Sequence, residues 1–239
     1  MKRLYKSLLE LLFPQRGCPL CGAKGPVGPC QRCGLFIYRS SAEPFCRICG
    51  RFFSEPAAGL CLECSSREWP FVFSRAALPY EGSLRSAVHR LKFGKRQAAV
   101  DFLGGLMADV FNRESAYRKA GMVVPVPLSP ARLEERGFNQ AELLAGVVAE
   151  NCGVELVTAL QKKADTPAQA QLDRDARRRN IKKSFRLIDN PVVRGKTVVV
   201  VDDVFTTGST LSSAAETLLE GGVKQVFGLV LGSGRTFPK

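Results

Sequence analysis

The sequence predicts an α/β fold in which helices flank a parallel sheet, with a small cysteine-rich domain in front of it. Three observations support this class. Residues 198–201 are four consecutive valines without polar alternation, a pattern typical of a strand that is buried on both faces. A helical pattern follows this strand in the segment LSSAAETLLEGG. Eight of the nine cysteines precede Trp69, so they belong to a separate N-terminal unit.

Residues 1–17 begin with MKRLYKSLLELLFP, which combines basic residues and leucines with Glu10. No small-residue cleavage site follows, so we expect a short amphipathic helix rather than a signal peptide, with contact to a membrane surface as the alternative. The chain contains no run of 18 apolar residues, and no transmembrane segment is expected.

The eight N-terminal cysteines form four Cys-x-x-Cys pairs, and this spacing lets both thiolates of a pair face one tetrahedral ion. Without an export signal, such cysteines indicate a reducing compartment, expected to be the cytoplasm, and metal rather than disulfides. Residues 18–68 are therefore predicted to be a double zinc ribbon with two structural Zn²⁺ ions, and redox chemistry is the alternative. The spacing is compatible with consecutive or interleaved pairing. The predicted ligands are Cys18, Cys21, Cys30, Cys33, Cys46, Cys49, Cys61 and Cys64.

Residues 71–239 are predicted to be the α/β domain. A strand begins near Phe71, a helix near Leu84, and another helix covers residues 98–112. Residues 122–126 read as a strand that ends in the turn PLSP. Asn139, with Glu142 three residues later, fits a capping box for a helix that stops at Gly153.

The segment TVVVVDDVFTTGSTL, residues 197–211, places two carboxylates at the predicted end of a buried strand, just before a helix. In open α/β sheets ligands bind outside the carboxyl ends of the strands, and a helix N-terminus attracts phosphate. Asp202 and Asp203 would repel a phosphate, so hydrogen bonds to sugar hydroxyls suit them better. The implied ligand is a ribose 5-phosphate, and the alternative is a buried strand capped by a polar turn. The predicted phosphate contacts are Thr206, Thr207, Gly208, Ser209 and Thr210.

This segment resembles the phosphoribosyl pyrophosphate (PRPP) motif of type I phosphoribosyltransferases. The resemblance implies that the two acids hold the ribose hydroxyls, that the loop holds the 5-phosphate, and that Mg²⁺ accompanies PRPP. The upstream string VPVPLSP is similar to the pyrophosphate loop of that family, which implies pyrophosphate contacts from Ser129 and Arg132. Lys92, in LKFG, is a further candidate phosphate contact, or else a cation at a helix C-terminus.

A longer resemblance joins the two predicted domains. The Cys-x-x-Cys pairs are followed by LKFGKR, VPVPLSPARLEERGFNQAELLA, RDARRRNIKKSF and VVVVDDVFTTGSTL. In this order the strings resemble the ComF family of competence-associated, phosphoribosyltransferase-like proteins, over about residues 18–231. The resemblance implies a type I phosphoribosyltransferase-like fold and a role in natural transformation, with single-stranded DNA or a DNA-processing protein as a partner.

The segment 174–186 carries seven basic residues. In phosphoribosyltransferases a mobile loop at this position closes over PRPP, which implies that role for Arg177, Arg178 and Asn180. The alternatives are a solvated basic helix and a surface that tracks the phosphates of a single strand. Phe185 is the one aromatic residue there, which weakens base stacking.

Two hypotheses follow for function. The first is an enzyme that transfers the phosphoribosyl group of PRPP to an acceptor that the sequence does not identify. The second is a non-catalytic module that senses PRPP or a nucleotide and binds single-stranded DNA or a DNA-processing partner. The formal net charge of +13 does not separate them, because most of the basic excess lies in residues 71–239, with the phosphate site.

Metal analysis tests the zinc prediction directly. Purified protein should contain about two Zn²⁺ ions per chain, because four Cys-x-x-Cys pairs supply two complete tetrahedral ligand sets. A ratio near one would leave one set of four without a metal, and iron with sulfide would overturn the assignment.

Overall fold

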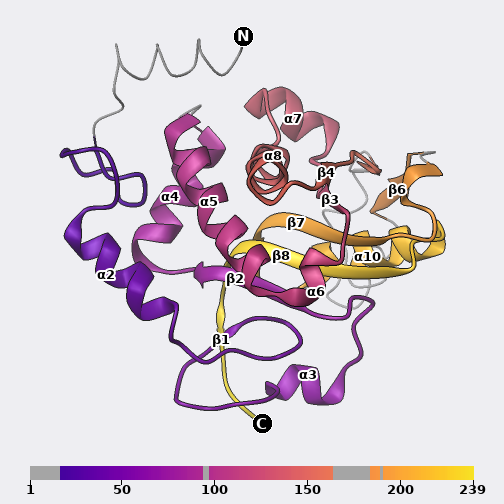
Figure 1. Ribbon diagram of the computed structural model, residues 1–239, viewed down its shortest axis with the longest axis horizontal. Coiled ribbons are helices and arrows are strands. Elements are labelled where there is room, and N and C mark those ends of the chain that lie inside the picture. Colours follow the sequence, from indigo (N-terminus) through magenta and orange to yellow (C-terminus); the bar gives the residue numbers. More distant parts are fainter. Residues whose placement is uncertain (1–16, 94–96, 164–183, 189–190) are drawn as a thin grey trace, which may run out of the picture.

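The computed structural model describes residues 17–93, 97–163, 184–188 and 191–239 (Figure 1). The predicted N-terminal helix and the residues Arg177, Arg178 and Asn180 lie outside these ranges. Among the described residues, no helix is long and apolar enough to cross a membrane.

A parallel sheet of five strands forms the centre of the molecule, as the sequence predicts. Its strand order is β2-β8-β7-β3-β4, so the valine-rich strand β7 is central and has a parallel neighbour on each side. The strands are β2 (Ser74–Pro79), β8 (Gln225–Ser233), β7 (Thr197–Phe205), β3 (Met122–Pro125) and β4 (Glu155–Leu156).

Strand β7 supplies both cores of the domain. Because successive side chains of a strand point to opposite faces, Val199 and Val201 enter one hydrophobic core and Val198 and Val200 enter the other. All four side chains are fully buried. Burying a valine contributes roughly 1.5–3 kcal/mol, which explains why this segment tolerates no polar alternation.

Helices cover both faces of the sheet. One face packs against α4, α5 and α8, where Gly104 of α5 lies so close to Val147 of α8 that a Cβ would meet its side chain at 2.5 Å. The other face packs against α10 and the hairpin β5-β6. The bounds are α4 (Gly82–Phe93), α5 (Gln97–Arg113), α8 (Gln140–Cys152), α10 (Ser209–Glu220), β5 (Leu160–Lys162) and β6 (Phe185–Leu187).

Short elements complete the described chain. The predicted cap of α8 is confirmed, since Asn139 Oδ1 accepts a hydrogen bond from the Ala141 N–H. Strand β7 is longer than expected: it continues past both aspartates and pairs with β8 as far as Phe205 and Ser233. The remaining elements are α2 (Gln31–Ser40), β1 (Phe52–Phe53), α3 (Leu62–Ser66), α6 (Ser115–Arg118), α7 (Pro130–Arg136), the 3₁₀ turn η2 (Pro191–Val193) and β9 (Arg235–Thr236).

The two cysteine clusters pack against opposite faces of the sheet. Cys18, Leu20 and Cys33 belong to the core beneath α4 and α8. The other four cluster cysteines belong to the core beneath α10, together with Phe53 and Phe71. Each half of the cysteine-rich region therefore extends one of the two cores instead of forming a core of its own.

The C-terminal residues attach the second cluster to the sheet. After β8, strand β9 pairs in parallel with β1, and Figure 1 shows the yellow C-terminal segment beside β1. Arg235 of β9 holds two carboxylates, with nitrogen–oxygen distances of 2.6 Å to Glu43 and 2.8 Å to Glu81, and it also donates to the Phe53 carbonyl. The C-terminal segment thus acts as a clasp between the two domains.

Replacing Arg235 with Ala should weaken this clasp. The side chain is about one third exposed, so solvent screens its ion pairs and we expect a loss of about 1 kcal/mol, or roughly 2–4 °C in Tm. Differential scanning fluorimetry measures the shift. Arg113→Ala is the matched control, because its guanidinium donates to Asp109 within its own helix. Equal melting temperatures for wild type and Arg235→Ala would contradict a stabilising role of Arg235 between the two domains.

Candidate functional site

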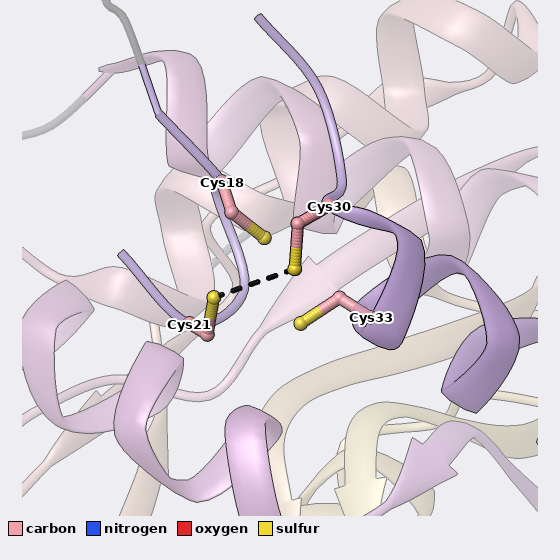
Figure 2. A group of neighbouring side chains, drawn as sticks. All are labelled: Cys18, Cys21, Cys30 and Cys33. Atoms are coloured by element: carbon pink, nitrogen blue, oxygen red, sulfur yellow. Dashed lines mark hydrogen bonds between the residues drawn. The ribbon is translucent and has the colours of Figure 1, made fainter. Parts of the chain in front are cut away.

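The first cysteine cluster brings four sulfurs together from two turns of the chain. Cys18 and Cys21 flank a tight turn in which the Gly22 N–H donates to the Cys18 carbonyl at 2.8 Å. Cys30 is the N-cap of α2, and Cys33 lies in the helix's first turn. Figure 2 shows all four side chains pointing toward one another, with the sulfurs of Cys21 and Cys30 at 3.7 Å. The ligand atoms lie within 4.8 Å of one another, which fits a tetrahedral zinc tetrathiolate.

The second cluster has the same spacing but is more enclosed. Cys46, Cys49, Cys61 and Cys64 are all buried, and their sulfurs also lie within 4.8 Å of one another. The pairing is therefore consecutive in both clusters, which excludes the interleaved alternative. N–H groups point at these sulfurs: Arg51 Nε lies 3.4 Å from Cys49 Sγ, and Trp69 Nε1 lies 3.2 Å from Cys64 Sγ. Such donors favour thiolates, the form that zinc requires.

The predicted phosphate loop, residues 206–210, connects β7 to the twelve-residue helix α10. Gly208 is the N-cap with φ of +73°, a left-handed conformation that suits glycine, and its carbonyl accepts from the Ser212 N–H at 2.8 Å. The hydroxyls of Thr207 and Ser209 lie 2.8 Å apart. Because the loop ends in a helix N-terminus with adjacent hydroxyl donors, it has the chemistry of an anion site.

The structure places the two aspartates in different surroundings. Asp202 is partly exposed and borders the same small cavity as Thr206, Gly208, Ser209 and Thr210. Asp203 is buried, and its Oδ2 lies 2.9 Å from Nζ of Lys92, which comes from α4. Adjacent residues of a strand point to opposite faces, so one carboxylate faces the phosphate loop and the other faces α4 and α8.

Gln140 is a site residue that the sequence analysis missed. Its Nε2 donates to Asp203 Oδ2 at 3.2 Å, and its Oε1 accepts from Arg136 at 3.2 Å. Asn139 also bonds the Val126 carbonyl at 3.0 Å, which fixes the start of α8 at the end of β3. Asn139 and Gln140 lie in the segment VPVPLSPARLEERGFNQAELLA, one of the strings on which the ComF resemblance rests, and this was the signal available in the sequence.

The predicted pyrophosphate contacts lie at the carboxyl end of β3, the strand next to β7. Ser129 is the N-cap residue of α7, and its buried Oγ has no hydrogen-bond partner among the described residues. Arg132 is exposed on the first turn of α7. No described contact joins either residue to the aspartates, so the structure brings them to the same edge of the sheet without linking them directly.

Although the residue is partly exposed, desolvation of its carboxylate, and then the negative charge of Asp203, raise the pKa of Asp202 well above its usual value. Two adjacent carboxylates at the end of an apolar strand are costly when both are charged. The Lys92 ammonium and the Gln140 amide offset this cost on the Asp203 side, where they contact the carboxylate.

Known protein families match both predicted domains of the chain. A double zinc ribbon domain matches residues 8–65, and a phosphoribosyl transferase domain matches residues 134–233. Competence protein ComFC of Streptococcus pneumoniae is 32% identical over 207 residues, covering 80% of this chain and 89% of that protein. The chain belongs to the ComF family. DNA utilization protein YhgH of Salmonella typhimurium is 32% identical over 216 residues. This alignment covers 87% of this chain and 86% of YhgH.

A third relative and one solved structure complete the comparison. Competence protein ComFC of Bacillus subtilis is 28% identical over 227 residues. This alignment covers 91% of this ComF chain and 84% of the Bacillus protein. The allosteric regulatory enzyme of purine biosynthesis shares 22% identity, with a TM-score of 0.41 over 59% of this chain and 29% of that enzyme. The family assignment rests on the sequence relatives and the two domain matches.

The raised pKa of Asp202 leads to a pH-dependent prediction. Between the unfolded value near 4 and the raised folded value, the native state binds more protons, so its stability falls as pH rises. Asp202→Asn keeps an oxygen that can accept the Asp203 N–H, 2.8 Å from Asp202 Oδ1, and removes the charge. The variant should therefore melt at a higher temperature than wild type at pH 8, by about 2–4 °C for each kcal/mol of electrostatic cost that the substitution removes. The difference should shrink toward pH 5.

Thermal melts at pH 5, 6, 7 and 8 measure this difference. Asp109→Asn is the matched control, because Asp109 is exposed on α5. A stabilisation of Asp202→Asn that is the same at every pH would rule out the electrostatic explanation.

Proposed function

We propose that this ComF protein binds a ribose 5-phosphate ligand of the PRPP type, together with Mg²⁺, at the carboxyl ends of β7 and β3. The observation that carries the proposal is the position of a carboxylate, Asp202, beside the loop that ends in the N-terminus of α10, both of which border one small hollow. A sugar phosphate matches both groups, because its hydroxyls donate to carboxylates and its phosphate accepts from N–H and O–H groups.

The phosphate end of the ligand would lie against residues 206–210. The backbone N–H groups of the first turn of α10 have no intrahelical partner, and the helix dipole favours an anion there. Thr206, Thr207 and Thr210 are exposed and can turn their hydroxyls toward a phosphate. Gly208 gives the loop its left-handed turn just before the helix, a conformation that glycine adopts readily because it carries no side chain.

The ribose would lie against the aspartates. Asp202 is the better candidate for direct hydroxyl contact, because Asp203 already accepts from Lys92 and Gln140. Mg²⁺, when bound with PRPP, would neutralise pyrophosphate charge and reduce the repulsion between the ligand and this acidic strand end. Ser129 and Arg132 are the proposed pyrophosphate contacts. The buried Ser129 hydroxyl, which has no hydrogen-bond partner in the described part of the chain, supports that assignment.

The reaction we propose is phosphoribosyl transfer. A nitrogen nucleophile of the acceptor forms a bond to the anomeric carbon while the bond from that carbon to pyrophosphate oxygen breaks, and pyrophosphate leaves with the electron pair. Positive charge develops on the ribose ring, and the carboxylates of Asp202 and Asp203 stabilise it electrostatically. Arg177, Arg178 and Asn180 are proposed to cover the ligand from the segment outside the described residues. The reducing conditions that the zinc ligands need support a cytoplasmic location.

Two double variants test the ribose side and the phosphate side of the proposed site separately. Asp202→Asn with Asp203→Asn should weaken binding of ribose 5-phosphate and PRPP by about 1–3 kcal/mol, or roughly 5- to 150-fold, while inorganic phosphate binds at least as well as in wild type. Thr207→Val with Thr210→Val should weaken all three ligands. Isothermal titration calorimetry in the presence of excess Mg²⁺ measures each affinity.

Thr217→Val is the matched control, because its hydroxyl donates to Ser213 farther along α10. If wild type shows neither heat nor a Tm shift with millimolar PRPP and Mg²⁺, the chain has the fold of a phosphoribosyltransferase without the ligand. Release of pyrophosphate with a panel of nitrogen acceptors then separates transfer from binding alone.

A role with DNA is the second candidate, and the names of the relatives favour it, since they are a DNA utilization protein and competence proteins. We propose that the basic segment 174–186 contacts single strands. Replacing Arg177, Arg178 and Arg179 with Ala should then lower affinity for a labelled single strand and flatten the dependence of log K on log salt, because fewer counterions are released. Unchanged binding in fluorescence anisotropy would remove this segment from the DNA hypothesis.

A further inference from the structure

Trp69 lies between the second cysteine cluster and the phosphate loop. Its Nε1 donates to Cys64 Sγ at 3.2 Å. On its other side the indole faces Gly208: a Cβ built on Gly208 would lie 2.5 Å from Trp69 Cζ3. One side chain therefore contacts both a metal ligand and the residue that caps α10.

The contact between Trp69 and the loop is extensive. The Trp69 ring lies 5.2 Å from the Phe71 ring and 5.8 Å from the ring of Phe205, the residue just before the loop. A Cβ on Gly208 would also meet Phe205 Cζ at 2.5 Å, so two aromatic rings enclose the glycine. The guanidinium of Arg67 covers the indole at 4.0 Å from its centroid. The position of the loop glycine is thus determined by an aromatic group that is tied to Cys64.

Arg51 makes a parallel connection. Its guanidinium donates to Cys49 Sγ at 3.4 Å and to Cys61 Sγ at 3.7 Å, and it also lies 6.0 Å from the Phe205 ring centroid. These two side chains, Arg51 and Trp69, touch three of the four sulfurs of the second cluster and the aromatic wall of the loop.

The first cluster has a different set of connections. The described donors to its sulfurs include the Ala23 N–H, 3.5 Å from Cys21 Sγ, and the Ser83 hydroxyl of α4, which donates to Cys33. Arg90 of α4 joins this cluster to the sheet by donating to the carbonyls of Pro19, Leu20 and Cys21. Cys21 and Cys30 are partly exposed. No described contact leads from this cluster to residues 206–210.

We propose that Trp69 is a positioning residue that couples zinc at Cys46, Cys49, Cys61 and Cys64 to the geometry of the phosphate loop. Zinc holds the four sulfurs as thiolates at fixed spacing, and a thiolate accepts the indole N–H more strongly than a thiol does. Loss of this zinc frees Cys64, releases Trp69 and loosens the glycine that the indole encloses. The consequence for phosphate binding rests on the proposed function, whereas the coupling between zinc and loop does not.

A stepwise zinc titration tests the coupling in the whole protein. The thiol reagent p-hydroxymercuriphenylsulfonate releases zinc, and a metallochromic dye counts the released ions. The more exposed first cluster should release its zinc first, because its sulfurs are more accessible and lack side-chain N–H donors among the described contacts. Mass spectrometry of the modified cysteines identifies which cluster has reacted. Fluorescence of Trp69, the single tryptophan of the chain, should stay constant during the first release and change during the second.

Hydrogen exchange gives a readout that needs no ligand. Peptides covering residues 206–212 should exchange at the wild-type rate after the first zinc leaves. After the second zinc leaves they should exchange at least about tenfold faster, which corresponds to a fall of about 1.4 kcal/mol in the free energy of local opening. Trp69→Leu should produce fast exchange in these peptides with both zinc ions still bound. Trp69→Phe keeps a ring but lacks the N–H donor, so its exchange should be intermediate. Tyr38→Leu, an exposed aromatic of the first ribbon, is the matched control and should behave as wild type.

The two proposals fail separately in this design. Unchanged exchange in residues 206–212 after the second zinc leaves, or in a folded Trp69→Phe protein, would overturn the coupling. If exchange responds as expected and wild type binds neither inorganic phosphate nor ribose 5-phosphate, the coupling stands and the proposed function fails. If both hold, Trp69→Phe and Trp69→Leu should weaken phosphate binding in the same order as they accelerate exchange. Should Trp69→Leu fail to fold, as judged by circular dichroism, Trp69→Phe alone carries the test.

Discussion

Burial of strand β7 on both faces is the constraint on which the rest of this structure depends. Its four valines need apolar partners above and below the sheet, and the chain supplies α4, α5 and α8 on one face and α10 on the other. Because only valines lie between Thr197 and Asp202, the first charged groups of the strand appear near the carboxyl edge of the sheet. The position of the site is thus a direct consequence of how the core is built.

The cysteine clusters extend the same two cores. A ribbon of about 25 residues is too small to build a hydrophobic core by itself, so metal ligation and packing on a larger domain together stabilise it. The first cluster packs beneath α4 and the second beneath α10. As a result, the first cluster lies behind the helix that carries Lys92, and the second lies behind the phosphate loop. Each predicted zinc site therefore packs behind an element that carries candidate site residues.

The two aspartates have different surroundings because adjacent side chains of a strand point to opposite faces of the sheet. Asp203 points toward α4 and α8, where Lys92 and Gln140 satisfy it, and it links the strand to both helices. Asp202 borders the loop cavity, and its negative charge is offset less than that of Asp203. Two neighbouring carboxylates therefore have different surroundings: Lys92 and Gln140 hold Asp203, whereas Asp202 borders the loop.

The fold class, both cysteine sets, strand β7, the cap of α8 and the loop before α10 could be predicted from the amino-acid sequence, because each depends on local periodicity or spacing. The consecutive pairing of the clusters, the extension of β7 to Phe205 and the contacts of Gln140 and Trp69 became visible only in the folded chain. Gln140 meets Asp203 across 63 residues, and Trp69 meets Gly208 between elements that only the folded sheet brings together. Local pattern carries no information about such contacts, since they depend on which helix covers which face of the sheet.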